Sequence, residues 1–220
     1  MLMEILAQRF TQNTQGIATA LATKLGSMRV ALTEGEGDEM TRAGLRFHMN
    51  ASGATGIAPV QALPSTAAQW LIVNQAGNTT TAFIDVVGMY LASGTAGAGG
   101  SVLACMVGPK FAPATVPTAS AANVQIMNAN PVSTRGSGIV VASGQTLVNA
   151  AVGNWTPIGA FMSPAGTILG QTQMDSRDIR GKFCIPPGCG LALAVISPTG
   201  TTPLFTPYAS WREYQADLET

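Results

Sequence analysis

The residues that could support acid–base or nucleophilic chemistry in this chain are few. His48 is the only histidine among 220 residues, so a Ser-His-Asp or Cys-His arrangement would have to include it. His48 lies within Arg-Phe-His-Met-Asn at the edge of a connector, and the chain contains no Gly-x-Ser-x-Gly motif. A single histidine in such a place is usually a surface or packing residue. We therefore expect no catalytic residue and no enzymatic activity.

A second group of ionisable residues lies in the C-terminal quarter. Asp175 and Asp178 are three positions apart, and such a pair could serve a glycosidase or help to bind calcium. Arg177, Arg180 and Lys182 lie beside the two carboxylates and neutralise them. Carboxylates in calcium-binding loops alternate more densely than this. The pattern favours a salt-bridged loop at a subunit contact, with Arg177 and Arg180 as candidate interface residues.

The sequence has no pattern typical of a cofactor or metal site. The run Gly94–Gly100 does not match Gly-x-Gly-x-x-Gly and lies between two expected strands, where it cannot open a helix. Three cysteines and one histidine lack the spacing of zinc ligands. Cys184 and Cys189 flank a Pro-Pro-Gly turn that could bring them together. Free buried thiols are the favoured interpretation, and their pairing stays open.

The three tryptophans, Trp70, Trp155 and Trp211, suggest two alternatives. They could form an aromatic platform that stacks on sugars, as in a lectin. Each lies in an expected strand, however, and aromatic residues are only 6% of the chain, so core or interface packing is favoured. Trp211 lies in the last expected strand, which looks exposed on one face. We therefore include it among the candidate interface residues.

The chain carries few charges. Charged residues are 10% of the sequence, against about 25% in typical soluble domains. Eleven basic and eleven acidic residues cancel, so no overall field would attract nucleic acid or an anionic membrane. The longest apolar runs are shorter than the roughly 20 residues of a membrane-spanning helix. A neutral, charge-poor surface favours association of copies, since little self-repulsion keeps them apart.

Residues 1–66 have the character of an arm and connector. The segments Met1–Phe10 and Ile17–Leu25 are expected to form short helices that need a surface on which to dock. Residues 33–42 are acidic and interrupted by glycine, which predicts a solvated loop, and Asn50–Ser65 reads as an irregular connector. The apolar side chains of the first helix are further candidate interface residues: Leu2, Ile5, Leu6 and Phe10.

Residues 67–220 are dominated by short strand patterns separated by turn signals. The expected strands are Gln69–Asn74, Ala82–Leu91, Val102–Val107, Ala122–Met127, Gly138–Ala142, Gln145–Val152, Trp155–Met162, Gly181–Ile185, Gly190–Ile196 and Tyr208–Tyr214. Pro186-Pro187-Gly188 predicts a type II turn, and Gly190–Ile196 is apolar on both faces. Strands at such intervals without intervening helices predict a mainly β fold, an antiparallel, jelly-roll-like β-sandwich.

Three stretches of the chain resemble β-sandwich structural proteins of tailed bacteriophage particles. They are Met40–Phe47 with Gly56–Val60, the strand pair Trp70–Leu91, and the closing segments Ile185–Gly188, Gly200–Phe205 and Trp211–Glu213. Such proteins are often neutral, poor in lysine and rich in Ala, Gly, Ser and Thr. The resemblance covers about two-thirds of the chain and carries over no catalytic or binding residue.

The resemblance implies a structural subunit of a virion, assembled in the host cytoplasm. The expected role is a capsid-associated protein, either decoration, cement or shell, with partners that are further copies of the chain and other virion proteins. The alternative is a tail or fibre component that acts as a receptor-binding or carbohydrate-binding module. No direct contact with nucleic acid or a membrane is expected in either case.

Overall fold

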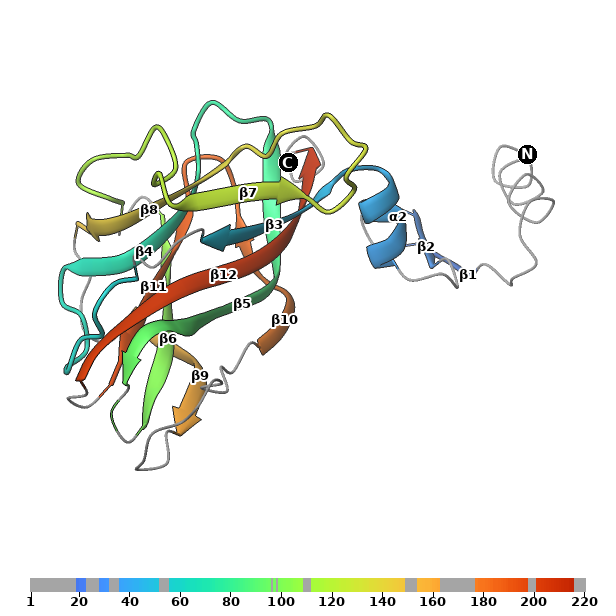
Figure 1. Cartoon of the computed structure of the whole chain (residues 1–220). Coiled ribbons are helices and arrows are strands. Elements are labelled where there is room, and N and C mark those ends of the chain that lie inside the picture. Colours follow the sequence, from blue (N-terminus) through green and yellow to red (C-terminus); the bar gives the residue numbers. More distant parts are fainter. Residues whose placement is uncertain are drawn as a thin grey trace, which may run out of the picture.

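The structure is a computed structural model that describes residues 19–22, 28–31, 36–51, 56–95, 97, 99–108, 112–148, 154–162, 177–197 and 201–215. Its main feature is a pair of five-stranded antiparallel sheets packed against each other (Figure 1). The predicted antiparallel β-sandwich is therefore confirmed. Among the described residues, no helix is long and apolar enough to cross a membrane.

The first sheet, sheet I, carries the strand order β10-β5-β12-β3-β7. Its strands are Arg177–Ile185 (β10), Thr80–Thr95 (β5), Thr201–Gln215 (β12), Arg46–Ala51 (β3) and Val124–Asn128 (β7). The last strand was expected to be more exposed on one face, and its burial alternates in this way, with Tyr208, Arg212 and Tyr214 half-buried between buried neighbours. β12 lies at the centre of sheet I between β5 and β3, so both of its edges are hydrogen-bonded.

The second sheet, sheet II, carries the order β8-β4-β11-β6-β9. Its strands are Ile139–Thr146 (β8), Ala67–Asn74 (β4), Gly190–Ile196 (β11), Gly99–Val107 (β6) and Thr156–Met162 (β9). β8 joins two segments that were predicted as separate strands around a Ser143–Gly144 turn. Gly144 adopts a φ of +63° inside the strand, so its freedom from a Cβ lets the chain bend without ending the pairing.

The sandwich begins earlier in the chain than the expected boundary at Ala67. β3 lies within the predicted arm, yet it pairs with both β12 and β7. Phe47 and Met49 on this strand are buried in the core. The alternation of apolar Phe47 and Met49 with polar neighbours is the period-2 pattern of a half-buried strand, so the arm does not extend to residue 66.

Two further segments of the predicted arm also differ from expectation. Thr19–Ala22 (β1) and Met28–Ala31 (β2) form an antiparallel pair, where a helix over Ile17–Leu25 was predicted. A single short helix is marginal in water, and strand pairing supplies partners for the backbone of β1 instead. Met1–Phe10, with its expected helix, lies outside the described residues.

Residues 36–42 form a helix, α2 (Glu36–Arg42), and not the solvated loop predicted there. Acidic residues in its first turn and Arg42 in its last turn complement the helix dipole. The helix ends in a Schellman motif, because Gly44 N–H bonds to Thr41 O at 3.0 Å and Leu45 N–H bonds to Met40 O at 2.9 Å. Gly44 has the φ of +68° that this motif requires.

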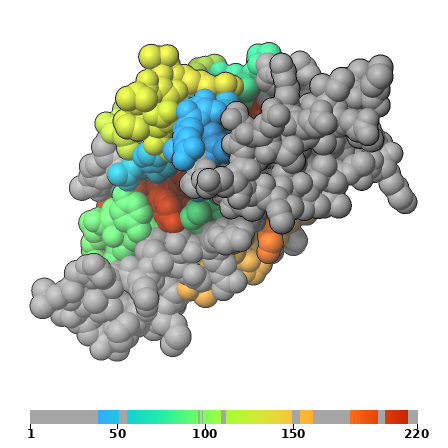
Figure 2. All heavy atoms as spheres, turned by 90° about the vertical axis from the view of Figure 1, so that its right-hand side faces the viewer, coloured from blue at the N-terminus to red at the C-terminus, as the bar shows by residue number. Residues whose placement is uncertain are grey.

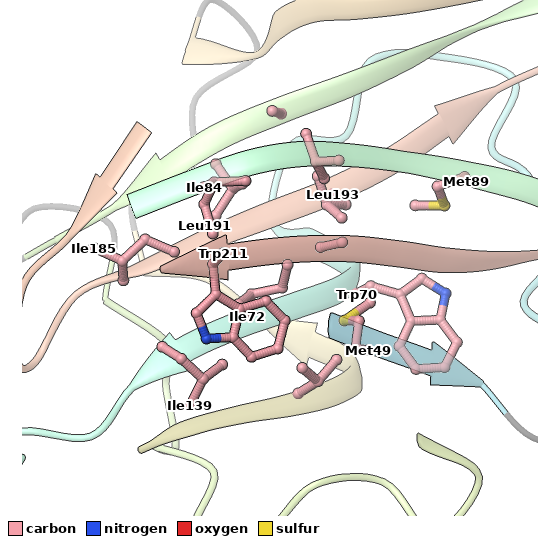
Figure 3. Close-up of a cluster of buried hydrophobic side chains, with 14 of the residues drawn as sticks. Met49, Trp70, Ile72, Ile84, Met89, Ile139, Ile185, Leu191, Leu193 and Trp211 are labelled. Atoms are coloured by element: carbon pink, nitrogen blue, oxygen red, sulfur yellow. The ribbon is translucent and has the colours of Figure 1, made fainter. Parts of the chain in front are cut away.

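The main hydrophobic core fills the space between the sheets. Figure 3 shows side chains of sheet I and sheet II meeting there, among them Met49, Trp70, Ile72, Ile84, Met89, Leu193 and Trp211. A second apolar cluster lies on the other face of sheet II, where Leu71, Cys105 and Ala192 are buried together with Trp155. Sheet II is thus buried on both faces, as the sequence of β11 predicts.

The connection from β10 to β11 carries the chain from sheet I to sheet II. Cys189 N–H donates to Pro186 O at 3.0 Å, and Gly188 between them has a φ of +80°. These values are those of the predicted type II turn, in which only glycine is free of strain at the third position.

The edge of sheet II at β8 is covered by the chain segment that precedes β7. Ala114 N–H bonds to Thr146 O at 2.9 Å and Ala121 N–H bonds to Val141 O at 2.8 Å. Val141 N–H donates to Ser120 Oγ at 3.1 Å. Since these bonds use backbone groups that an unpaired edge would offer to another strand, this edge is closed to pairing with a second chain.

Candidate functional site

A β-bulge at Asp85 determines which side chains of β5 point away from the core. Pairing between β12 and β5 passes from Ser210–Val86 to Trp211–Ile84 and leaves Asp85 without an opposite residue. Ile84 and Val87 both face the core, so the bulge shifts the alternation of β5 by one position. Asp85 consequently points away from the core.

Among the side chains that the structure describes, the outer face of sheet I gathers the polar aromatic residues and several titratable ones. All three tyrosines of the chain, Tyr90, Tyr208 and Tyr214, and its single histidine, His48, alternate with core residues on their strands and therefore lie there. We define this surface, the outer face, by the side chains of Arg46, His48, Phe83, Asp85, Tyr90, Met127, Tyr208, Ser210, Arg212 and Tyr214.

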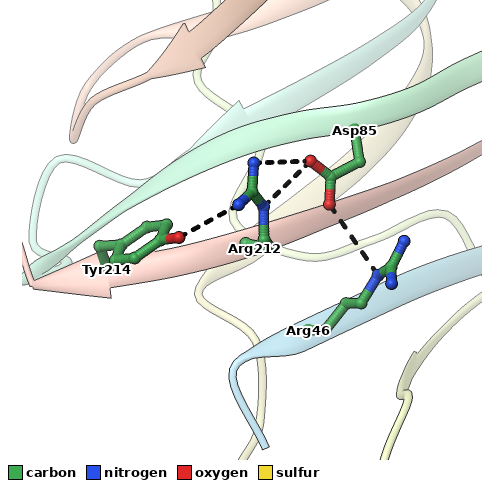
Figure 4. Close-up of polar contacts among 4 residues, drawn as sticks. All are labelled: Arg46, Asp85, Arg212 and Tyr214. Atoms are coloured by element: carbon green, nitrogen blue, oxygen red, sulfur yellow. Dashed lines mark hydrogen bonds and ion pairs between the residues drawn. The ribbon is translucent and has the colours of Figure 1, made fainter. Parts of the chain in front are cut away.

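Asp85 is the centre of an ion-pair network on the outer face (Figure 4). Asp85 Oδ1 accepts from Arg212 Nε at 3.0 Å and Nη2 at 2.9 Å, and Asp85 Oδ2 lies 3.9 Å from Arg46 Nε. Arg212 Nη1 also donates to the Tyr214 hydroxyl at 3.2 Å. Each of β5, β12 and β3 contributes one charged residue, so the network joins three neighbouring strands.

Aromatic contacts hold the same arginine in place. The Arg212 guanidinium carbon lies 5.9 Å from the centre of the Tyr214 ring. Phe83 packs edge-on against Tyr214 with ring centres 5.3 Å apart. Arg212 is therefore fixed by a carboxylate, a hydroxyl and a ring face, a preorganised arrangement that costs little ordering entropy when a partner binds.

The two arginines differ in how much they remain available. The side chains of Asp85 and Arg212 are 11% and 14% exposed, whereas that of Arg46 is 34% exposed. One carboxylate faces two guanidinium groups, and the shorter contacts go to Arg212. Arg46 therefore retains capacity to bind a further acidic group.

A second buried carboxylate, Glu213, lies on the core side of β12. Trp211 Nε1–H donates to its Oε1 at 3.0 Å, and the Ser137 hydroxyl donates to the same oxygen. Thr80 Oγ1 and Gly138 N lie 3.3 and 3.4 Å from its Oε2. All four donors are uncharged, and two of them belong to the segment leading into β8, so Glu213 connects sheet I to sheet II.

Most of the candidate interface residues lie where their side chains are not described. Leu2, Ile5, Leu6 and Phe10 are outside the described residues, and so is Asp175. Arg177 and Arg180 lie on β10, with nothing described of their side chains. The backbone from Arg177 is strand, so the loop predicted for the cluster Asp175–Asp178 is wrong for Arg177 and Asp178.

Trp211 does not contribute surface to an interface. Its side chain is 0% exposed and stacks on Phe47, with ring centres 6.3 Å apart and an angle of 25° between the planes. Trp70 and Trp155 are buried as well, one between the sheets and one in the second cluster. The core interpretation of the three tryptophans is confirmed, which removes the reason for expecting a tryptophan platform for sugars.

One cross-strand neighbour of His48 is a serine, so two residue types of a Ser-His-Asp triad lie side by side. His48 pairs with Ser210 on β12 and with Met127 on β7. A triad also needs an acid that orients the imidazole. Asp85, the acid of the outer face, instead binds the two arginines, so its carboxylate serves the ion-pair network.

The three cysteines are free thiols, which answers the question that the Pro-Pro-Gly turn left open. Burial raises the pKa of the Cys105 thiol and that of the Cys189 thiol above their ordinary range. Thiols with a raised pKa are poor nucleophiles and poor metal ligands near neutral pH. Among the described residues, no group of three or more His, Cys, Asp or Glu side chains is arranged to hold a metal ion.

The sequence did not predict the Asp85 network. The available signal was that Asp85 is one of only three charged residues between Phe47 and Met174, inside an otherwise apolar strand. An isolated acid in such a strand needs a partner when it is buried. Which partner it has depends on the strand order of sheet I and on the bulge, and neither can be read from the chain.

Comparison of the chain with protein-family models, with curated proteins and with solved structures found no match in any of the three. The strand order itself defines the chain as an antiparallel β-sandwich.

Proposed function

We propose that this chain is a non-catalytic structural subunit that associates with further copies of itself through the outer face of sheet I. The observation that carries the proposal is the concentration of all three tyrosines, two arginines and an exposed methionine on that face. Tyrosine, arginine and methionine are enriched at protein interfaces and contribute much of their binding energy.

Low charge supports the same proposal. With eleven charges of each sign, copies do not repel one another over long distances. The outer face rests on a rigid sheet whose strands are joined by the Asp85 network, so little order is lost when it binds. The covered edge at β8 disfavours association by strand addition at that edge.

The finer proposal is that the assembly is a bacteriophage particle. It rests on the resemblance of the quoted stretches to virion structural proteins and on the lysine-poor, Ala/Gly/Ser/Thr-rich composition. Within that proposal the chain is a capsid-associated protein with a jelly-roll-like sandwich. A receptor-binding role in a tail or fibre has less support, because its motivating tryptophans are buried.

Light scattering over a range of protein concentrations tests the coarser proposal. We expect a mass that is a multiple of the 22.5 kDa chain and that rises with concentration. A mass of one chain at every concentration up to about millimolar would overturn the proposal. Negative-stain images of the concentrated protein test the finer one, since a virion subunit is expected to form closed rings or shells.

A further inference from the structure

The outer face of sheet I carries more positive than negative charge at its centre. Arg212 uses Nε and Nη2 to bind Asp85 Oδ1, at 3.0 and 2.9 Å. Arg46 reaches the other oxygen only at 3.9 Å and leaves a third of its side chain exposed. His48 follows two positions later on the same face of β3. A carboxylate placed at Arg46 would therefore find a positioned cation.

The chain itself contains a dense acidic segment. Glu34, Glu36, Asp38 and Glu39 place four of the eleven acidic residues within six positions, and no basic residue occurs between Arg29 and Arg42. The last of the four, Glu39, is exposed on α2. Figure 1 shows α2 beside the start of β3 and beyond the end of sheet I, and in Figure 2 the blue residues, which begin at the end of α2 and continue into β3, lie at the surface.

We propose that the acidic segment 34–39 of a second copy docks on the outer face of sheet I and places its carboxylates at Arg46. The inference rests on the proposed function and deepens it by naming the two surfaces that meet. Charge complementarity favours this pairing over outer face against outer face, since the latter would bring two sites with excess positive charge together.

The donor and acceptor surfaces of this contact differ, so it is heterologous. Each copy offers its acidic segment to one neighbour and its outer face to another. A heterologous contact closes into a ring when its rotation allows and otherwise continues as an open array. A chain that uses this contact is expected to form assemblies larger than dimers.

Charge reversal on each side, followed by mixing, tests the proposal. In sedimentation velocity, we expect Arg46→Glu and the triple variant Glu36→Lys, Asp38→Lys, Glu39→Lys each to raise the Kd of self-association about tenfold or more. The control Val116→Glu adds a negative charge at an exposed position of the segment that covers the β8 edge, outside both proposed surfaces, and is expected to associate like the wild type. An equimolar mixture of the two charge-reversed proteins is expected to associate again.

Salt gives a second readout of the same contact. Association of the wild type is expected to weaken between about 50 and 500 mM NaCl, because the added ions screen partly exposed charges. Arg46→Glu is expected to lose most of this dependence. Thermal unfolding of each variant shows whether it is folded. If Arg46→Glu does not fold, Arg46→Gln is measured in its place. The acidic-segment variant then gives an independent result, because its changes lie outside the sandwich.

The outcomes separate this inference from the proposed function. A wild type that is monomeric at every concentration overturns both. A wild type that associates, with Kd unchanged in folded Arg46 and acidic-segment variants, overturns this inference and leaves the proposed function standing. Loss of association in both variants without recovery in the mixture also overturns it, because complementary surfaces must restore binding.

Discussion

At the scale of single residues, the structure depends on two carboxylates that are held in opposite ways. Asp85 lies on the outer face and is bound by charged guanidinium groups. Glu213 directly follows Arg212 on the same strand, faces the core and is bound by neutral donors. The two acids stabilise different features, since Asp85 joins strands within sheet I and Glu213 joins the two sheets.

Removal of Asp85 should destabilise the fold strongly. Asp85→Ala leaves the mostly buried Arg212 without its counter-ion, and breaking such a pair costs about 3–5 kcal/mol, toward the lower end for a site that keeps some water. Urea unfolding measures the loss. Arg135→Ala, on an exposed loop, is the control and should stay within about 0.5 kcal/mol of the wild type. Equal effects of the two changes would contradict the assigned role of Asp85.

Substitution of Glu213 tests the connection between the sheets. Glu213→Gln keeps the size of the side chain but replaces an acceptor oxygen with a donor amide that faces N–H and O–H groups. We expect a loss of about 1–3 kcal/mol in unfolding free energy, because a buried polar group is left without a suitable partner. Circular dichroism during thermal unfolding reports it, and an unchanged melting temperature would show that these bonds contribute nothing.

The buried thiols predict a loss of stability at alkaline pH. Burial raises the pKa of Cys105 in the folded state, so the folded chain retains a proton that the unfolded chain loses. This contribution is complete below the thiol pKa of the unfolded chain, about 8.5, and is lost as pH rises through the higher folded value. Urea unfolding between about pH 8 and 10 checks the sign. In Cys105→Ala the decline should be smaller than in the wild type.

At the scale of elements, the sequence patterns predicted the strands well wherever apolar residues alternate or run continuously. β4, β6, β9 and β11 all overlap their predicted segments. Prediction failed where a local rule was overridden by pairing. Gly144 resembles a turn residue but bends a continuous strand, and Arg177 and Asp178, which were predicted to lie in a charged loop, pair with Val87 and Val86 of β5.

The outer face shows the same division. Period-2 alternation places Tyr208 and Arg212 on one face of their strand, and this much is available from the sequence alone. The contact between Arg212 and Asp85 is not, because it joins residues 127 positions apart through a bulge. Long-range strand order is set by the packing of the whole core, which no local pattern encodes.

The Pro-Pro-Gly turn allows a matched test of an element. Gly188→Ala forces a residue with a Cβ into a φ of +80° and should cost about 1–2 kcal/mol. Gly77→Ala is the control, because Gly77 lies in another turn, has no positive φ and has no atom within 4 Å of an added Cβ. Chemical denaturation should find the control within about 0.5 kcal/mol of the wild type. A larger effect at Gly77 than at Gly188 would contradict the turn assignment.

At the scale of the whole molecule, the two sheets differ in which of their faces are buried. Sheet II is buried on both faces, whereas sheet I contributes apolar side chains to the core from one face and presents the tyrosines, arginines and histidine on the other. A molecule built in this way has one strongly differentiated surface. Our account makes that surface the place where copies meet.

The most direct test of this claim compares association of the wild type with that of a protein changed only on the outer face. Tyr208→Glu adds a negative charge at the half-buried centre of the face, and Val116→Glu adds the same charge at an exposed loop position elsewhere. In sedimentation velocity, we predict oligomers for the wild type and for Val116→Glu, and a folded monomer for Tyr208→Glu. A folded Tyr208→Glu protein that associates as tightly as the wild type would contradict the account.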